Sequence, residues 1–368
     1  MSVHAPLSPI TPAWLPQGGG HNAGIHGLRG VAAAMVLFAH IIGGTAEHVY
    51  SASPGYLAVA EPLWNFGTFF VYLFFAISGY VILPSAFRYS PGDFAFRRMV
   101  RIYPLFLACS LVFIVGNLIW NLEPEVNNPT AIFYALTFTN LLVGAKQLTP
   151  NAWSLSYEMM FYALAAAGAY AVLQRRFGLG LVVAVASAAF VALYPKAIYF
   201  TVGIMVFAMN SEGMTRKIPL RPLAELAAAI GLAVAASQSH FDFHPGELSQ
   251  PITLTCLTLT GIYFLLAVEP DSLTARALSA RWAQYLGTIS YSLYLVHPYV
   301  YMPMRVLFQR FDLFGDNVVL SVAIFGTVTA LASVALAQFS FVIFEKFPQN
   351  LAKSWAKRPK FIQKETRP

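Results

Sequence analysis

The sequence predicts an all-α, polytopic integral membrane protein with about ten transmembrane helices and both termini in the cytoplasm. Of the 368 residues, 57% are hydrophobic and 11% are charged, whereas about 25% of the residues in a soluble domain are charged. Apolar runs recur that are long enough for a spanning helix, which needs about 20 mostly apolar residues. Basic residues are concentrated in every second connection between these runs, as the positive-inside rule describes for membrane proteins.

The first expected helix covers residues 25–44. Residues 1–24 are rich in Pro and Gly and contain no Lys or Arg. A secretory signal starts with basic residues, so we expect a disordered cytoplasmic tail here instead. The other expected spans are residues 64–83, 102–120, 153–173, 178–194, 197–210, 222–238, 251–268, 283–301 and 318–344. Residues 131–144 are apolar but short, and are expected to lie at the membrane interface or to re-enter the bilayer. Residues 349–368 are expected to form a basic cytoplasmic tail, which leaves residues 25–348 as one membrane domain.

The basic residues determine the expected orientation. With the N-terminus inside, the cytoplasmic connections contain Arg88, Arg97, Arg98, Arg101, Arg175, Arg176, Arg216, Lys217, Arg221, Arg276 and Arg281, and the C-terminal end is also basic. The outer connections contain Lys146, Lys196, Arg305 and Arg310. Because the formal net charge of +7 is spread over short loops, it indicates topology rather than a nucleic-acid-binding surface. Cys109 and Cys256 lie inside apolar runs without a Cys/His cluster, so we expect no metal site.

The first expected helix carries two ionisable side chains, Arg29 and His40. They are eleven residues apart, so they share one face of the helix and lie about 16 Å apart along its axis. Ionisable residues within a span are costly and usually functional, which favours a functional role for His40 in the outer half of the bilayer. A snorkelling anchor is the simpler explanation for Arg29, and helix packing is the alternative for His40.

Charged residues also occur at the ends of later spans. Arg98 and Arg101 are three residues apart and point to one side of a helix. Guanidinium groups suit phosphate, although positive-inside charge is the simpler explanation of the charge alone. Glu158 enters the membrane about 7–8 Å from the outer end of its helix, and we expect it to lie at the depth of His40. A structural partner for a His or Arg is the alternative. Glu345 closes the last span and is expected to pair with basic residues.

The remaining candidates are mostly hydroxyl groups. Ser78 and Gly79 interrupt an aromatic run near the inner surface, where a ligand contact or close helix packing would each explain them. Tyr291, Tyr294 and His297 lie in the ninth expected span. They are a candidate acceptor or oxyanion site, with an aromatic belt as the alternative.

The depths of these residues form a pattern. The arginines are expected at the inner face, and His40, Glu158 and His297 in the outer half. A basic inner mouth suits a phosphorylated cytosolic donor, and an outer His/Glu site suits proton transfer to or from an acceptor outside. The pattern therefore predicts that a group is passed across the membrane.

These stretches together resemble the acyltransferase family 3 of integral membrane acyltransferases, which includes exopolysaccharide and O-antigen O-acetyltransferases. The similarity covers residues 25–348 and is closest to the exopolysaccharide type. In order, the motifs are Arg29 followed after ten residues by His40, FFAISGYVI, RRMVRIYPLF, WSLSYEMMFY, LGTISYSLYLVHP and FEKF. His26 departs from the pattern, because relatives often have Asp or Gln there. The extracytoplasmic hydrolase-like domain of some members is absent, so no role that needs a second catalytic domain is expected.

The resemblance implies transfer of an acyl group, usually acetyl from acetyl-CoA, to a hydroxyl of an envelope or exopolysaccharide glycan, free or lipid-linked, at the bacterial inner membrane. It implies acyl-CoA as co-substrate and no bound cofactor. The implied acyl-CoA-binding residues are Arg29, Arg98, Arg101 and Ser78. His40 would be the general base and Glu158 would orient it. Tyr and Ser hydroxyls would stabilise the oxyanion. A covalent acyl-His intermediate and an acyl group other than acetyl both stay open.

Two other classes of function are alternatives. A proton-coupled transporter of a glycan or small metabolite would use His40 and Glu158 as a proton relay. Paired broken helices in inverted repeats would support it, and the sequence shows no such pairing. A non-catalytic sensor on the same fold would lack His40 or Arg101, and this chain has both. The arginine cluster favours the enzyme.

Overall fold

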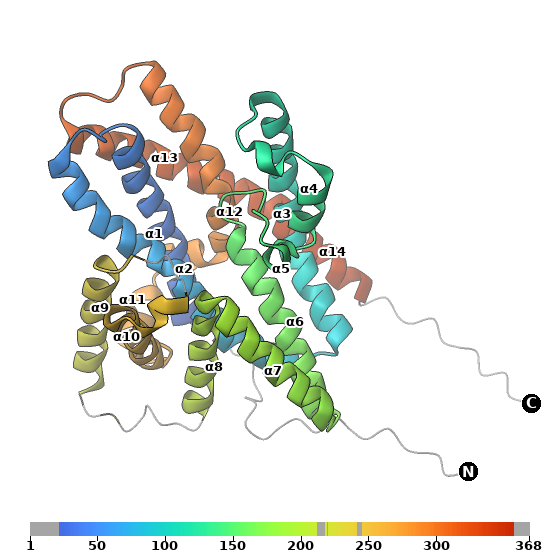
Figure 1. Ribbon diagram of the computed structural model, residues 1–368. Helices are drawn as coiled ribbons and strands as arrows, with labels where there is room; N and C mark the ends of the chain where they lie inside the picture. Colours follow the sequence, from blue (N-terminus) through green and yellow to red (C-terminus); the bar gives the residue numbers. More distant parts are fainter. Residues whose placement is uncertain (1–21, 212–217, 219, 241–244, 357–368) are drawn as a thin grey trace, which may run out of the picture.

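The computed structural model describes residues 22–211, 218, 220–240 and 245–356, and the regular structure in this part of the chain is entirely helical (Figure 1). The N-terminal helices are α1 (Ala23–His48), α2 (Pro54–Arg88) and α3 (Pro91–Trp120). The middle of the chain forms α4 (Pro129–Leu136), α5 (Asn140–Val143), α6 (Trp153–Leu173), α7 (Phe177–Leu193), α8 (Ile198–Ser211) and α9 (Arg221–Ser237). The C-terminal part forms α10 (Pro251–Ala267), α11 (Leu273–Leu278), α12 (Arg281–Arg310), α13 (Val318–Ser340) and α14 (Phe347–Ala356).

Helices occupy all ten segments that were expected to span the membrane, with ends that differ by several residues. The largest differences are at the starts of α3 and α2, which begin at Pro91 and Pro54 rather than at residues 102 and 64, because a proline is well placed in the first turn of a helix. By length and composition, the helices able to cross a membrane are α1, α2, α3 and the continuous helix Val318–Ser354. The pair α7 and α8 is a fifth candidate, bent by 120°. The chain is thus a multi-pass helical membrane protein, while ten spans and cytoplasmic termini stay predictions.

Close packing of α1 against α12 depends on glycines that face each other. A Cβ atom added to Gly30 would lie 2.4 Å from the backbone nitrogen of Gly287, and one added to Gly287 would lie 2.3 Å from the carbonyl oxygen of His26. Glycine allows this approach because it has no side chain. The His26 ring lies 3.1 Å from the carbonyl oxygen of Gln284 and 3.2 Å from the Thr288 hydroxyl. His26 therefore belongs to the contact between α1 and α12.

A second glycine contact joins α2 to α8. A Cβ atom at Gly79 would lie 2.1 Å from the carbonyl oxygen of Phe200, and one at Gly203 would lie 1.9 Å from that of Ala76. The expected helix-packing role of the Ser78–Gly79 pair is therefore correct for Gly79. Figure 1 shows α9, α10 and α11 on one side of α1 and α2, and α3, α4 and α5 on the other. Helix α6 packs against both α2 and α3.

We expect Gly30→Ala to lower the stability of the protein, because backbone atoms on α12 cannot move aside for the new methyl group. Overpacking of this kind costs about 1–3 kcal/mol. Thermal unfolding in detergent should show a lower melting temperature. The control is Gly180→Ala in α7, where the new Cβ would meet its nearest neighbour at an ordinary 4.0 Å. Equal melting temperatures for the two variants would contradict the importance of this contact.

Candidate functional site

The contact between α1 and α12 brings two histidines together. The ring centroids of His40 and His297 lie 4.9 Å apart with an interplanar angle of 64°. Trp64 from α2 packs edge-on against His40 at 5.3 Å. A Cβ atom at Gly43 would lie 2.2 Å from the Trp64 ring, so this glycine leaves the space that the indole occupies. Three helices thus converge on His40.

The hydrogen bonds of the two rings differ in a way that matters for proton transfer. In each ring Nδ1 lies beside a carbonyl oxygen one turn back, Val36 for His40 at 2.8 Å and Leu293 for His297 at 3.0 Å. A carbonyl only accepts, so each Nδ1 carries the proton and each Nε2 has the free electron pair. In His297 this Nε2 accepts from the Asn151 amide at 3.2 Å. In the described part of the chain, Nε2 of His40 has no hydrogen-bond partner, so it is the imidazole nitrogen available as a base.

Three arginines cluster nearer the start of α1 and on α3. Arg29, Arg98 and Arg101 line one cavity. Arg98 donates from Nη2 to the Ser85 hydroxyl at 3.2 Å, and its guanidinium carbon lies 5.8 Å from the centroid of the Tyr162 ring. Its Nε is buried and has no hydrogen-bond partner within the described residues. A buried N–H without a partner is costly, so this cavity can accept an anion that supplies one.

Glu158 lies in the arginine cavity, and this differs from the expectation that it pairs with His40. Its Oε1 accepts hydrogen bonds from the Ser78 hydroxyl at 2.8 Å and from the Tyr162 hydroxyl at 2.6 Å. Among the described residues, no hydrogen bond joins Glu158 to His40. The physical reason is that a carboxylate in an apolar helix needs nearby hydrogen-bond donors and positive charge. Helix α2 supplies a donor, and α3 supplies arginines next to Arg29.

A second cavity adjoins the first and leads toward Tyr294, beside the histidines. The two share Arg29, Ser78, Glu158 and Tyr291, and the second extends to Ser154 and Tyr294. The hydroxyls of Ser154 and Tyr294 are 2.8 Å apart, and the Tyr294 ring centroid is 6.4 Å from that of His297. Tyr291 instead donates its hydroxyl to the carbonyl oxygen of Ile102 at 2.7 Å. Polar groups therefore continue from the arginines to the histidine pair.

Glu345 lies in a π-helical turn, Phe341–Lys346, between α13 and α14. Its carboxylate is buried, accepts a hydrogen bond from the Ser292 hydroxyl at 2.5 Å, and is within electrostatic range of Arg29 and Arg101. Pairing with basic residues was expected, but within the described residues no ion pair joins Glu345 to an arginine, and its hydrogen bond goes to Ser292. The π turn could not be anticipated, because the FVIFEK stretch reads as ordinary helix.

Sequence reasoning missed Asn151, which holds the site together from outside the helices. Its side-chain amide donates to the Tyr294 carbonyl oxygen at 2.9 Å as well as contacting His297. The available signal was an Asn two residues before the WSLSYE motif, and a helix-capping role is the usual explanation for such a residue. Ser154 and Trp64 were also missed, since small or aromatic residues are common in any membrane helix.

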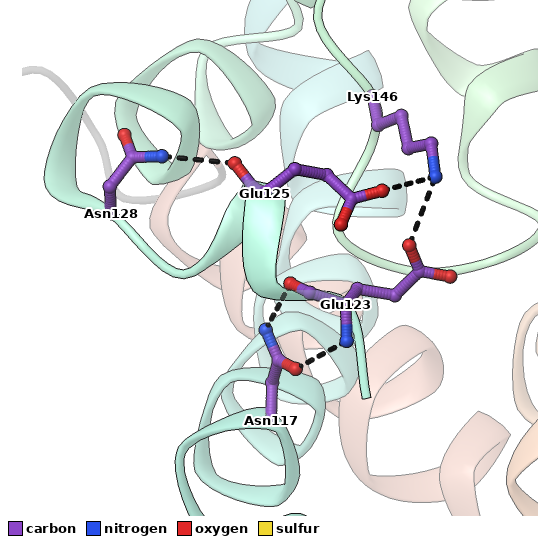
Figure 2. A network of polar contacts seen from close by, with 5 residues as sticks. All are labelled: Asn117, Glu123, Glu125, Asn128 and Lys146. Carbon is purple, nitrogen blue, oxygen red and sulfur yellow. Dashed lines mark hydrogen bonds and ion pairs between the residues drawn. The ribbon is translucent and has the colours of Figure 1, made fainter. Parts of the chain in front are cut away.

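The connection between α3 and α6 that carries Asn151 is fixed by a polar network at its base (Figure 2). Asn117 exchanges two hydrogen bonds with the backbone of Glu123, at 2.8 and 2.9 Å. Lys146 bridges Glu123 and Glu125, and this ammonium group lowers the pKa of Glu125 to about 2. A carboxylate with a lowered pKa stays ionised until the pH falls toward that value, so the bridge persists across the physiological range.

Near Asn151 this connection contacts α6 through side chains. The Ser156 hydroxyl donates to Oδ1 of Asn140 at 2.7 Å, and the Gln147 amide donates to Ser156 at 3.2 Å. These bonds fix the segment directly before Asn151. Within the described residues, no group of three or more His, Cys, Asp or Glu side chains is arranged to hold a metal ion.

Comparison with known proteins identifies the family of this chain. The sequence profile of an acyltransferase domain, acyltransferase family 3, matches residues 22–338. A protein of Komagataeibacter xylinus, provisionally named membrane-bound transacylase BcsY, is 28% identical over 348 residues, which cover 88% of this chain and 81% of that protein. No solved structure shows a significant match. The chain belongs to the acyltransferase family 3 of membrane proteins.

Proposed function

We propose that this protein transfers an acyl group, with acetyl as the leading candidate, from a cytoplasmic acyl-CoA to a hydroxyl of an envelope or exopolysaccharide glycan at the bacterial inner membrane. One observation carries the proposal: two adjoining cavities lead from an arginine cluster to Tyr294, beside a histidine pair in which His40 has a free Nε2. The name of the similar protein, a transacylase, supports the same type of reaction.

The arginine cavity is the proposed donor site. The 3′,5′-ADP and pyrophosphate groups of CoA are anionic, and guanidinium groups bind phosphate through paired, charge-assisted hydrogen bonds. The buried Nε of Arg98 would gain an acceptor when a phosphate enters. Glu158 would balance the arginine charges while the site is empty, since it lines the same cavity. The flexible pantetheine arm would then place the thioester in the second cavity.

The proposed reaction is a direct acyl transfer. Nε2 of His40 takes the proton of the glycan hydroxyl, and the hydroxyl oxygen attacks the thioester carbonyl carbon. A bond from this oxygen to the acyl carbon forms, the carbon–sulfur bond breaks, and the CoA thiolate receives the proton from the imidazolium. The Tyr294 and Ser154 hydroxyls, which line the second cavity, are the best-placed donors to the developing oxyanion.

A proton relay in a transporter is the competing function. It would need transfer between His40 and Glu158, and the hydrogen bonds of Glu158 go to Ser78 and Tyr162 instead. Arg29 and His40 lie about 16 Å apart along the axis of α1. Glu158 lines the same cavities as Arg29, the residue at the far end of this separation from His40. The decisive assay incubates purified protein with radiolabelled acetyl-CoA and crude envelope polysaccharide. Label in the glycan supports the transferase, whereas no label and no CoA binding would support the transporter.

We expect His40→Ala to abolish transfer while leaving acyl-CoA binding unchanged. Loss of a general base lowers the rate by about 10²–10⁴-fold. Transfer rates and donor binding should be measured on the same purified protein. His48→Ala is the matched control, because this residue ends the same helix with an exposed side chain. Full activity of the His40 variant would refute the proposed base.

We expect Arg101→Ala and Arg98→Ala each to weaken acyl-CoA binding by about 10–100-fold, the value of a lost hydrogen bond to a charged group. Isothermal titration with a non-transferable acyl-CoA analogue measures this directly. Arg97→Ala is the control, because Arg97 stacks 4.3 Å above the Tyr89 ring and does not line the cavity. If all three variants bound equally, the arginine cavity would not be the donor site.

We expect Asn151→Ala to lower kcat and to leave the KM for acyl-CoA unchanged, because Asn151 contacts His297 rather than the arginine cavity. Without the amide donor, the His297 ring loses a hydrogen bond that holds it beside His40. A general loss of folded protein would also lower the amount of acyl-CoA bound per mole of protein, so donor binding should be measured alongside kcat. Asn128→Ala, in the same connection, is the control for loosening of the loop. A wild-type kcat in the Asn151 variant would contradict this positioning role.

A further inference from the structure

The second cavity has one apolar wall, and α2 provides most of it. Val71, Phe74 and Phe75 lie on this wall with Leu155 of α6. Phe74 precedes Ser78 by four residues, so the two are neighbours on one face of the helix, about 6 Å apart along its axis. On α2, Ser78 hydrogen bonds to Glu158 in the donor cavity, and Trp64 contacts His40. Phe74 lies between these two residues along the helix, and therefore between the donor cavity and the histidine pair.

Phe74 differs from the other members of this wall in its packing. Val71, Phe75 and Leu155 are buried, at 6%, 3% and 3% exposed. Phe75 is also held between the rings of Phe200, at 4.5 Å, and Tyr157, at 5.8 Å. Phe74 is half-buried and packs edge-on against the Tyr294 ring, with centroids 5.8 Å apart. Its side chain is thus the part of the wall that closes the cavity without belonging to the tightly packed core.

We propose that the second cavity holds the acyl group of the donor and that Phe74 limits the length of that group, so that the enzyme selects short acyl chains. The inference rests on the proposed transferase function. An acyl group of two carbons would reach the hydrogen-bonded hydroxyl pair of Ser154 and Tyr294 without displacing Phe74. A longer chain would have to extend along the wall of α2, where the Phe74 ring stands against Tyr294.

The effect of Phe74 on the selectivity for acyl-chain length can be given a magnitude. Each additional methylene group buried in an apolar site strengthens binding about fourfold, so a donor site with room would favour longer chains. With the Phe74 ring in place, longer chains gain no such contact. Removing the ring should give that gain to each methylene that fills the vacated volume.

The test compares wild type, Phe74→Ala and Phe74→Leu in transfer from acetyl-, butyryl- and hexanoyl-CoA to the same polysaccharide. Wild type should prefer acetyl. Phe74→Ala should raise kcat/KM for butyryl relative to acetyl by about tenfold or more, from two methylenes at about fourfold each. Phe74→Leu should give an intermediate profile, and it keeps the measurement informative if the alanine variant is poorly folded.

Phe66→Ala is the matched control, because Phe66 is a half-buried phenylalanine of the same helix that does not line the cavity. A wild-type chain-length profile in both Phe74 variants, with acetyl transfer intact, would overturn this inference and leave the transferase standing. An equal shift in the Phe66 variant would also overturn it. If wild type transferred no acyl group and bound no acyl-CoA, the proposed function would fail, and this inference with it.

Discussion

The close approach of α1 to α12 is the constraint on which the candidate site depends. Gly30 and Gly287 face each other at a distance that leaves no room for a side chain. Because both helices are continuous, this contact also determines how they meet about three turns further on, where His40 and His297 pack together. In a bilayer, helices gain little from hydrophobic association and rely on such close packing. The glycines thus set the geometry of residues that they do not touch.

The polar groups divide into two sets that differ in hydrogen bonding. At the arginine end, Glu158 and Glu345 are bound by hydroxyls and lie near positive charge. At the histidine end, Asn151 occupies one imidazole nitrogen and leaves another open. A buried polar network is stable only when its members are satisfied, so the groups left unsatisfied, Arg98 Nε and His40 Nε2, are the places where a ligand has most to offer. Arg98 lines the first cavity, and His40 packs against His297, next to the Tyr294 end of the second cavity.

Local patterns in the sequence were sufficient for the fold class, because hydropathy and charge bias do not depend on how helices pack. They also singled out Arg29, Ser78, Arg98 and Arg101 as candidates, since an ionisable or polar group within a span is conspicuous, and the structure places these four around one cavity. The surroundings of Glu158 could not be predicted, because a depth estimate along one helix says nothing of which donors the neighbouring helices present. Asn151 was missed for a similar reason. It acts from a connection, where an Asn is unremarkable, and its partners are about 145 residues away in the chain.

The π-helical turn at Phe341–Lys346 has a consequence for how an insertion or deletion in this stretch would act. A π turn accommodates one extra residue within an α-helix, and one residue corresponds to about 100° of rotation around the axis. The face that α13 presents to its neighbours and the face that α14 presents are therefore out of phase. The extra residue turns Glu345 inward toward Ser292. A gain or loss of one residue in this stretch acts as a rotary adjustment, which can retune the charge beside the arginines without altering the rest of the bundle.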